Sequence, residues 1–172
     1  RSGLGWKSWG GIRWISRGGC AVSTEERFDA VVLGGGLLGC FAARHLTSYQ
    51  LRCALIEARE DVCTGISRGN SAIIYTGCDN KPGTLKARLC VQANRAFEEL
   101  CAQLSVPFVR RGSLLVSYGP RGDYVVRRKY HQGLENGVEN LEILTGTQAV
   151  ALEPGLASGI SSALLAPGTG VT

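Results

Sequence analysis

The chain has 172 residues, of which 44% are hydrophobic, and carries a net charge of +5. This length suffices for a domain with a hydrophobic core, and no apolar run approaches the roughly 20 residues of a membrane-spanning helix. Four of the 19 basic residues and none of the 14 acidic residues lie in residues 1–24, so the remainder is near neutral. A near-neutral folded part argues against a nucleic-acid-binding surface.

Residues 1–24 form a basic, serine-bearing head without acidic residues. This composition is typical of a mitochondrial transit peptide, although its glycines make it a poor helix. The alternative is an untemplated or mistranslated leader. The chain has no methionine and stops in a glycine- and threonine-rich run, so we expect it to be a stretch of a longer protein. We predict a mitochondrial location, and a cytoplasmic one otherwise.

A glycine-punctuated stretch covers residues 28–57. An apolar strand is predicted over 28–33, a helix over 37–48, and a second strand over 52–56. The second strand ends at Glu57, a carboxylate placed to accept hydrogen bonds from ribose hydroxyls. This strand–turn–helix–strand order is that of a dinucleotide-binding unit.

Three glycines after the first strand have separate expected roles. Gly34 permits a tight exit from the strand, Gly36 lets a pyrophosphate approach the backbone, and Gly39 lets the helix pack on the sheet. Backbone N–H groups of the first helical turn, which contains Leu37 and Leu38, would face the phosphates at the positive end of the helix dipole. The alternative is a βαβ unit with an ordinary glycine turn.

Seven cysteines are spread along the chain without a C-x-x-C pair, which excludes a zinc pattern or a secreted disulfide framework. We expect reduced, semi-buried thiols in a reducing compartment, with a catalytic thiol as the alternative. Cys53 falls in a predicted strand, and Cys40, Cys90 and Cys101 fall in predicted helices. The two histidines, His45 and His131, are too few to favour a histidine-based metal site.

A long helix is predicted after Thr84, which can cap its N-terminus. Its apolar residues recur at spacings of three and four, which predicts a helix covering the core. These residues are Leu85, Leu89, Ala93, Phe97, Leu100 and Leu104.

The pattern then changes to hairpin-like strands and helices. Two strands are predicted on either side of Arg110 and Arg111, at 106–109 and 113–118. Two later strands are predicted at 141–144 and near Leu164 and Leu165. Helices are predicted at 122–136 and 147–152. We place a domain change between about residues 79 and 106. Arg110 and Arg111 either face an anionic substrate or form a solvated pair.

The irregular segment 64–71 is rich in hydroxyls, glycines and an amide. Such a segment offers N–H groups and hydroxyls to a phosphate or a flavin; the alternative is an ordinary polar loop. Further motifs follow it in order. They are NSAIIYTG at 70–77, KPGTLKARL at 81–89, VPF at 106–108, GSLLV at 112–116, GLENGV at 133–138 and LEP at 152–154.

With the glycine stretch, these motifs resemble the FAD-dependent oxidoreductases of the D-amino-acid oxidase and glycerol-3-phosphate dehydrogenase superfamily. Two branches are most similar, the anaerobic-type glycerol-3-phosphate dehydrogenases and the L-2-hydroxyglutarate dehydrogenases. The resemblance implies an α/β fold, in which a Rossmann-like FAD-binding βαβ unit precedes the start of an α+β substrate domain, both incomplete. The implied divisions are a leader at 1–24, the N-terminal part of the FAD-binding domain at 25–105, and a partial substrate domain at 106–172.

The resemblance also implies the cofactor FAD and its binding residues. The glycines would hold the pyrophosphate, Glu57 the adenosine ribose, and the segment after Arg59 the pyrophosphate, ribityl chain or flavin ring. The implied residues are Gly34, Gly36, Leu37, Leu38, Gly39, Glu57, Ala58, Arg59, Ser67, Arg68, Asn70 and Ser71.

The implied reaction is hydride transfer to flavin from a small 2-hydroxy acid or polyol phosphate, with a base removing the hydroxyl proton. Tyr75 stands where the family has a histidine beside the flavin, and a phenol is a poorer base than an imidazole at neutral pH. The base therefore lies elsewhere, or this copy is a truncated, non-catalytic flavoprotein-like module. An NAD(P)-dependent dehydrogenase is a third hypothesis, although Glu57 would repel a 2′-phosphate. The sequence indicates no particular electron acceptor, and we do not expect the 172 residues to be active alone.

Overall fold

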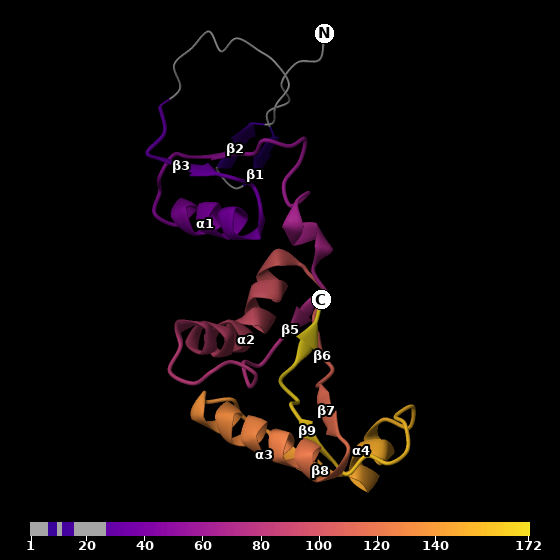
Figure 1. Cartoon of the computed structure of the whole chain (residues 1–172). Coiled ribbons are helices and arrows are strands. Elements are labelled where there is room, and N and C mark those ends of the chain that lie inside the picture. The colour runs from indigo at the N-terminus through magenta and orange to yellow at the C-terminus, as the bar shows by residue number, and fades with distance from the viewer. Residues whose placement is uncertain (1–6, 10–11, 16–26) are drawn as a thin grey trace. The chain divides into compact units, whose positions relative to one another are not determined.

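The computed structural model describes residues 7–9, 12–15 and 27–172 (Figure 1). The chain divides into two compact units, Arg1–Ser71 and Ala72–Thr172. This division falls earlier than the change of pattern expected between residues 79 and 106. The reason is that the long helix after Thr84 packs into the core of the second unit.

In the described part of the first unit, a mainly parallel sheet packs with helix α1. Strand β3 (Ala30–Leu33) leads through a glycine turn into α1 (Leu37–Thr47), and β4 (Cys53–Ile56) pairs in parallel with β3, from Ala30 opposite Cys53 to Leu33 opposite Ile56. Cys53, Ala54 and Leu55 are buried. The predicted strand–turn–helix–strand order is confirmed, and a short 3₁₀ helix, η1 (Ile66–Gly69), follows.

Two strands of the head extend this sheet. β2 (Ile12–Ile15) pairs in parallel with β4, and β1 (Lys7–Trp9) pairs antiparallel with β2, so the strand order is β1-β2-β4-β3. The sequence predicts no strand in residues 1–24. The remainder of the predicted leader lies outside the described residues, and its role as a transit peptide stays a prediction.

The second unit contains two three-stranded antiparallel sheets. One has the order β5-β10-β6 and the other β7-β9-β8, and α3 packs on the latter (Figure 1). Its strands are β5 (Ile73–Ile74), β6 (Val109–Arg110), β7 (Leu114–Ser117), β8 (Glu142–Thr145), β9 (Ser162–Leu165) and β10 (Gly170–Val171). Its helices are α2 (Leu85–Leu104), α3 (Gly119–Glu135) and α4 (Gly146–Leu152).

The predicted hairpin around Arg110 and Arg111 is wrong. β6 and β7 do not pair with each other, because β6 pairs with β10 and β7 pairs with β9. Gly112 has a φ of +73°, and at this point the chain passes from one sheet to the other. β5 and β10, of two residues each, carry no periodicity that a sequence pattern could detect.

Helix α2 begins as predicted but buries a different face. The Thr84 hydroxyl accepts a hydrogen bond from the Ala87 N–H group and caps the helix. The predicted stripe starts with Leu85 and Leu89, which are 59% and 51% exposed. The buried residues are instead Ala87, Val91, Asn94 and Cys101. The prediction counted large apolar residues, whereas the core side of the helix uses small side chains and one amide.

Val91 joins α2 to the main core of the second unit, which otherwise comes from α3, β9 and their flanking residues. The members of this cluster are Val91, Val126, Val138, Leu141, Leu164 and Ala166. This packing explains why α2 belongs to the second unit.

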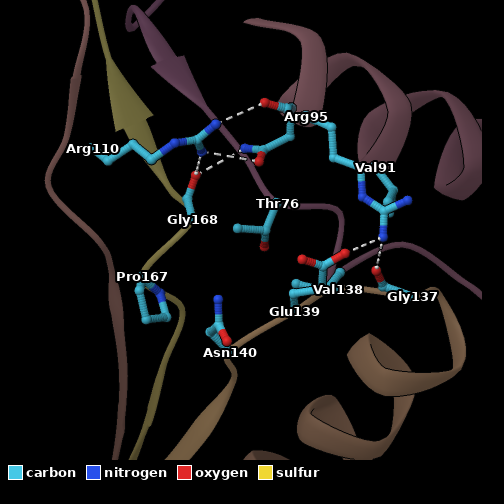
Figure 2. A pocket seen from close by; sticks show the side chains of 11 residues that line it. Thr76, Val91, Arg95, Arg110, Gly137, Val138, Glu139, Asn140, Pro167 and Gly168 are labelled. Atoms are coloured by element: carbon cyan, nitrogen blue, oxygen red, sulfur yellow. Dashed lines mark hydrogen bonds and ion pairs between the residues drawn. The ribbon is translucent and has the colours of Figure 1, made fainter. Parts of the chain in front are cut away.

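Asn94 and Arg110 form a polar clamp beside this core. The Asn94 amide donates to the carbonyl oxygens of Tyr75 and Gly168 at 3.2 and 3.0 Å, and also to that of Ile74. The Arg110 guanidinium donates to Asn94 Oδ1 and to the Gly168 carbonyl, as Figure 2 shows for Arg110 and Gly168. Arg110 also pairs with Glu98 at 3.3 Å. The Arg110 guanidinium thus ties α2 to the chain after β9. Contact of Arg110 and Arg111 with an anionic substrate stays a prediction.

Replacing Asn94 with alanine is expected to destabilise the protein by about 1–3 kcal/mol. Asn94 is 8% exposed, so its loss leaves carbonyl groups and one guanidinium N–H without their partner. The measurement is denaturant unfolding of the intact protein. The control is Gln92→Ala at an exposed position of the same helix. Equal stability of the two variants would show that the clamp contributes nothing.

Asp123 joins α3 to the ends of two strands. Its Oδ1 atom accepts hydrogen bonds from the hydroxyls of Ser117, Ser161 and Ser162 at 2.7, 2.6 and 2.6 Å. These bonds, that of Ser161 above all, lower the pKa of Asp123, and Arg127 adds to this effect.

We expect this carboxylate to make stability depend on pH. Because the pKa is lowered on folding, the stabilisation is present above the unfolded value of about 3.9 and is lost as the pH falls through the folded value. Asp123→Asn should therefore be less stable than the wild type at neutral pH and should lose less stability on acidification. Unfolding temperatures measured at neutral and acidic pH check this. Glu142→Gln, at an exposed position of β8, is the charge-matched control and should behave as the wild type does.

Candidate functional site: the glycine turn

The glycine turn, residues 34–39, connects β3 to α1 in the first unit. Gly34 has a φ of +100°, a conformation that side chains disfavour, and its N–H group donates to the Ile56 carbonyl at 2.7 Å. A Cβ atom at Gly39 would overlap the carbonyl oxygen of Gly34. Gly34 thus makes the tight exit, and Gly39 the close approach of helix to strand, that the sequence predicts.

Gly36 differs from these two glycines because it has space beside it. Its φ of −73° suits any residue, and a Cβ atom there would meet only the Ser67 hydroxyl, at 3.4 Å. That hydroxyl accepts a hydrogen bond from the Leu37 N–H group at 3.0 Å. The turn therefore has open backbone on one side and a hydroxyl at the first amide of α1.

The N-terminus of α1 is suited to an anion. Its first turn contains no acidic residue, and the residue before the helix makes no side-chain capping bond. Leu37 and Leu38 supply N–H groups of this turn, which point along the positive end of the helix dipole. Amides, a glycine without Cβ and a nearby hydroxyl fit a pyrophosphate by their chemistry.

Glu57 follows β4 and reaches back to the turn. Its Oε2 atom accepts from the Gly35 N–H group at 2.6 Å, and its Oε1 atom accepts from the Arg59 N–H group at 2.9 Å. The bond from Arg59 first, and then that from Gly35, lower the pKa of Glu57. The side chain is therefore held as a carboxylate, which has acceptor capacity for a further donor such as a ribose hydroxyl.

The segment after Glu57 is only partly gathered at the turn. Ser67 lies there through its bond to Leu37, and the Asn70 amide donates to the Ser67 carbonyl at 2.6 Å. The Arg59 guanidinium donates to the Thr64 carbonyl at 3.0 Å, which closes the loop that contains it. Ala58, Arg68 and Ser71 are exposed. Tyr75 is 58% exposed and belongs to the second unit.

Three residues at the turn were not anticipated. A Cβ atom at Gly35 would lie 2.8 Å from Val62 Cγ1, and the Gly35 carbonyl accepts from the N–H group of Cys63 and the thiol of Cys40. The middle position of the three-glycine run was a signal for Gly35. No sequence signal connected the two cysteines to the turn.

The elements that contain the cysteines agree with the sequence analysis. Cys53 lies in β4, Cys40 in α1, and Cys90 and Cys101 in α2. All the cysteines in the described part of the chain are free thiols, and Cys53 and Cys101 are buried.

Among the same described residues, no helix is long and apolar enough to cross a membrane.

A cavity of about 290 Å³ lies in the second unit, beside the clamp of Asn94 and Arg110. Figure 2 shows Thr76, Pro167 and Asn140 around it, with Arg95 paired to Glu139 at 2.6 Å. The guanidinium groups of Arg95 and Arg110, which line this cavity, already have partners. The glycine turn is therefore the stronger candidate for a cofactor site.

Comparison with known proteins agrees with this geometry. Residues 29–172 match the family model described as FAD dependent oxidoreductase. The chain belongs to this family of FAD-dependent oxidoreductases. FAD is the family's cofactor, and the residues of the glycine turn fit its pyrophosphate.

Two relatives illustrate the range of the family. A glycerol 3-phosphate dehydrogenase from Caloramator mitchellensis is 41% identical over 144 residues, which are 84% of this chain and 30% of the relative. A mitochondrial L-2-hydroxyglutarate dehydrogenase from Arabidopsis thaliana is 32% identical over 164 residues, which are 93% of this chain and 32% of the relative. The chain thus spans about a third of the length of these curated relatives.

A solved structure has the same fold. The L-α-glycerophosphate oxidase from Mycoplasma pneumoniae, solved with FAD bound, superposes with a TM-score of 0.78 at 24% identity. The superposition covers 86% of this chain and 39% of the oxidase. The mixed α/β architecture expected from the sequence is therefore that of an FAD-binding oxidoreductase.

Proposed function

We propose that this chain is the N-terminal part of an FAD-dependent dehydrogenase that oxidises a small hydroxylated anion. The substrate would be glycerol 3-phosphate or a 2-hydroxy acid such as L-2-hydroxyglutarate. The observation that carries the proposal is the glycine turn, with Glu57 bonded to Gly35 and Ser67 bonded to Leu37. The names of the relatives support these two substrate classes.

Each residue of the proposed site has a physical role. Gly36, the Leu38 amide and, once released from the Ser67 hydroxyl, the Leu37 amide would take the pyrophosphate, with that hydroxyl beside it. Glu57 would take the adenosine ribose, and Ala58 and Arg59 would flank the adenine. Arg68, Asn70 and Ser71 would contact the ribityl chain or the flavin ring. When bound, FAD accepts a hydride from the substrate carbon.

The proton of the substrate hydroxyl needs a base. Tyr75, at the position of the family histidine, would orient the substrate through its exposed hydroxyl, while the base is supplied by another part of the protein. The same tyrosine supports the second candidate function, a flavoprotein-like module without catalysis. We also propose a functional division into an FAD-binding part at 25–105 and a substrate-domain part at 106–172, in which α2 would serve the FAD-binding part although it packs within the second compact unit.

Purification of the full-length protein tests the first function. Its absorption spectrum should show flavin bands near about 370 and 450 nm. With an artificial electron acceptor it should oxidise one of the two anions with a higher kcat/KM than the other. A colourless protein would contradict FAD binding, and a yellow protein without turnover of either anion would favour the non-catalytic module.

Mitochondrial targeting is a separate proposal. It is supported by the basic, acid-free composition of residues 1–24 and by the mitochondrial designation of the Arabidopsis relative. A fluorescent protein fused behind an initiator methionine and residues 1–24 should collect in mitochondria. Replacement of the four basic residues by glutamine should abolish this, and a diffuse signal from both fusions would exclude targeting by this segment.

A further inference from the structure

Two thiols meet behind the glycine turn. Cys40 lies in the first turn of α1, and Cys63 lies in the loop after β4. The Gly35 carbonyl oxygen accepts the Cys63 N–H group at 2.7 Å and the Cys40 thiol at 3.4 Å. One carbonyl group thus positions both cysteines, although they come from different elements.

Their common bond partner makes the two cysteines neighbours. Burial first, and then the neighbouring Cys63 thiol and its hydrogen bond, raise the pKa of Cys40; the charge of Glu57 acts in the same direction. Both cysteines are only half-buried, so a small oxidant can reach them. Cys63 has a φ of +57°, an uncommon conformation that the bond to Gly35 helps to hold.

We propose that Cys40 and Cys63 form a reversible disulfide when the protein meets a peroxide. The Cys63 sulfur attacks one peroxide oxygen, the O–O bond breaks, and a sulfenic acid and one water form. The Cys40 sulfur then attacks the Cys63 sulfur and displaces a second water. Two thiols lose two protons and two electrons, and one hydrogen peroxide becomes two waters. A dithiol reductant reverses the step.

The disulfide would join the two segments that enclose Gly35. One is the first turn of α1, and the other is the loop that begins at Glu57, whose carboxylate accepts from the Gly35 N–H group. With these segments linked, the turn can open less, and a bound FAD should leave more slowly. This effect on release rests on the proposed FAD binding, whereas formation of the disulfide does not.

Peptide mapping of the intact protein tests the disulfide. The protein is treated with hydrogen peroxide, quenched in acid, alkylated and digested. We expect a peptide that links Cys40 to Cys63 and is about 2 Da lighter than its two reduced halves, and its loss after dithiothreitol. Cys63→Ser should lack this peptide, and Cys90→Ser, at a half-buried cysteine of α2, should retain it. Alkylation of both Cys40 and Cys63 in the peroxide-treated wild type would overturn the proposal.

The rate of flavin release tests the consequence separately. In the oxidised wild type, FAD fluorescence should appear more slowly than in the reduced protein, by about threefold or more. In Cys63→Ser, peroxide should leave the rate unchanged. A linked peptide with an unchanged release rate would refute the effect on the turn. A protein without any flavin would refute the proposed function and leave the peptide map valid.

Discussion

Replacing Gly39 with alanine is expected to cost the protein about 3 kcal/mol or more of folding stability. The new Cβ atom would overlap the carbonyl oxygen of Gly34. That oxygen belongs to the backbone of a turn whose preceding strand is hydrogen-bonded to β4, so it cannot move aside like the end of a flexible side chain. The helix would have to separate from the sheet. Denaturant unfolding of the intact protein, followed by circular dichroism, measures the loss.

Gly69→Ala is the matched control for this substitution. Gly69 ends η1, and a Cβ atom there would have no neighbour within 4 Å. This variant should have the stability of the wild type. If Gly39→Ala also unfolded like the wild type, the close approach of α1 to β3 would be incorrect.

Replacing Gly36 with alanine should have a different effect, loss of FAD with the fold retained. The φ of −73° accepts a side chain, and the only neighbour of the new methyl group is the Ser67 hydroxyl at 3.4 Å. The methyl group would nevertheless occupy the side of the turn that we propose for the pyrophosphate. An obstruction that costs about 2.7 kcal/mol of binding lowers the affinity about 100-fold. Titration of the apoprotein with FAD measures it.

The two glycine variants form an informative pair, because the same change is made three residues apart in one turn. Gly36→Ala should melt like the wild type apoprotein, whereas Gly39→Ala should melt earlier. Full retention of flavin by Gly36→Ala would reject the pyrophosphate assignment. A Gly36→Ala protein that fails to fold would instead show that the space beside Gly36 is needed for packing.

Local pattern was sufficient for much of the first unit. The strand, turn and helix around Gly34 and Gly39 depend on residues that are close in the sequence. Gly34 is required by its positive φ, and Gly39 by its contact with the Gly34 carbonyl oxygen. The ends of α1, β4, α2 and α3 were likewise predictable to within a few residues. Thr84 capped α2 as expected, because a capping bond spans only three residues.

Pairing across long distances could not be predicted in this way. Val109 and Arg110 pair with β10, some sixty residues later in the chain, and no feature of the segment 106–118 distinguishes this from a hairpin. The buried face of α2 depends on the partners of Asn94 and Val91, which lie on other elements. Counting apolar residues selected a neighbouring face, on which Leu85 and Leu89 are exposed and Phe97, Leu100 and Leu104 are half-buried.

The sequence by itself determined that this protein contains a glycine turn between a strand and a helix, because the glycine spacing and the two apolar runs depend on local steric requirements. Only the tertiary structure decided what surrounds that turn. It placed the Glu57 carboxylate on the Gly35 amide and the Ser67 hydroxyl on the Leu37 amide, and it brought Cys40 and Cys63 to the Gly35 carbonyl. These contacts join separate segments, and their geometry follows from how the chain packs rather than from the residues adjacent to them.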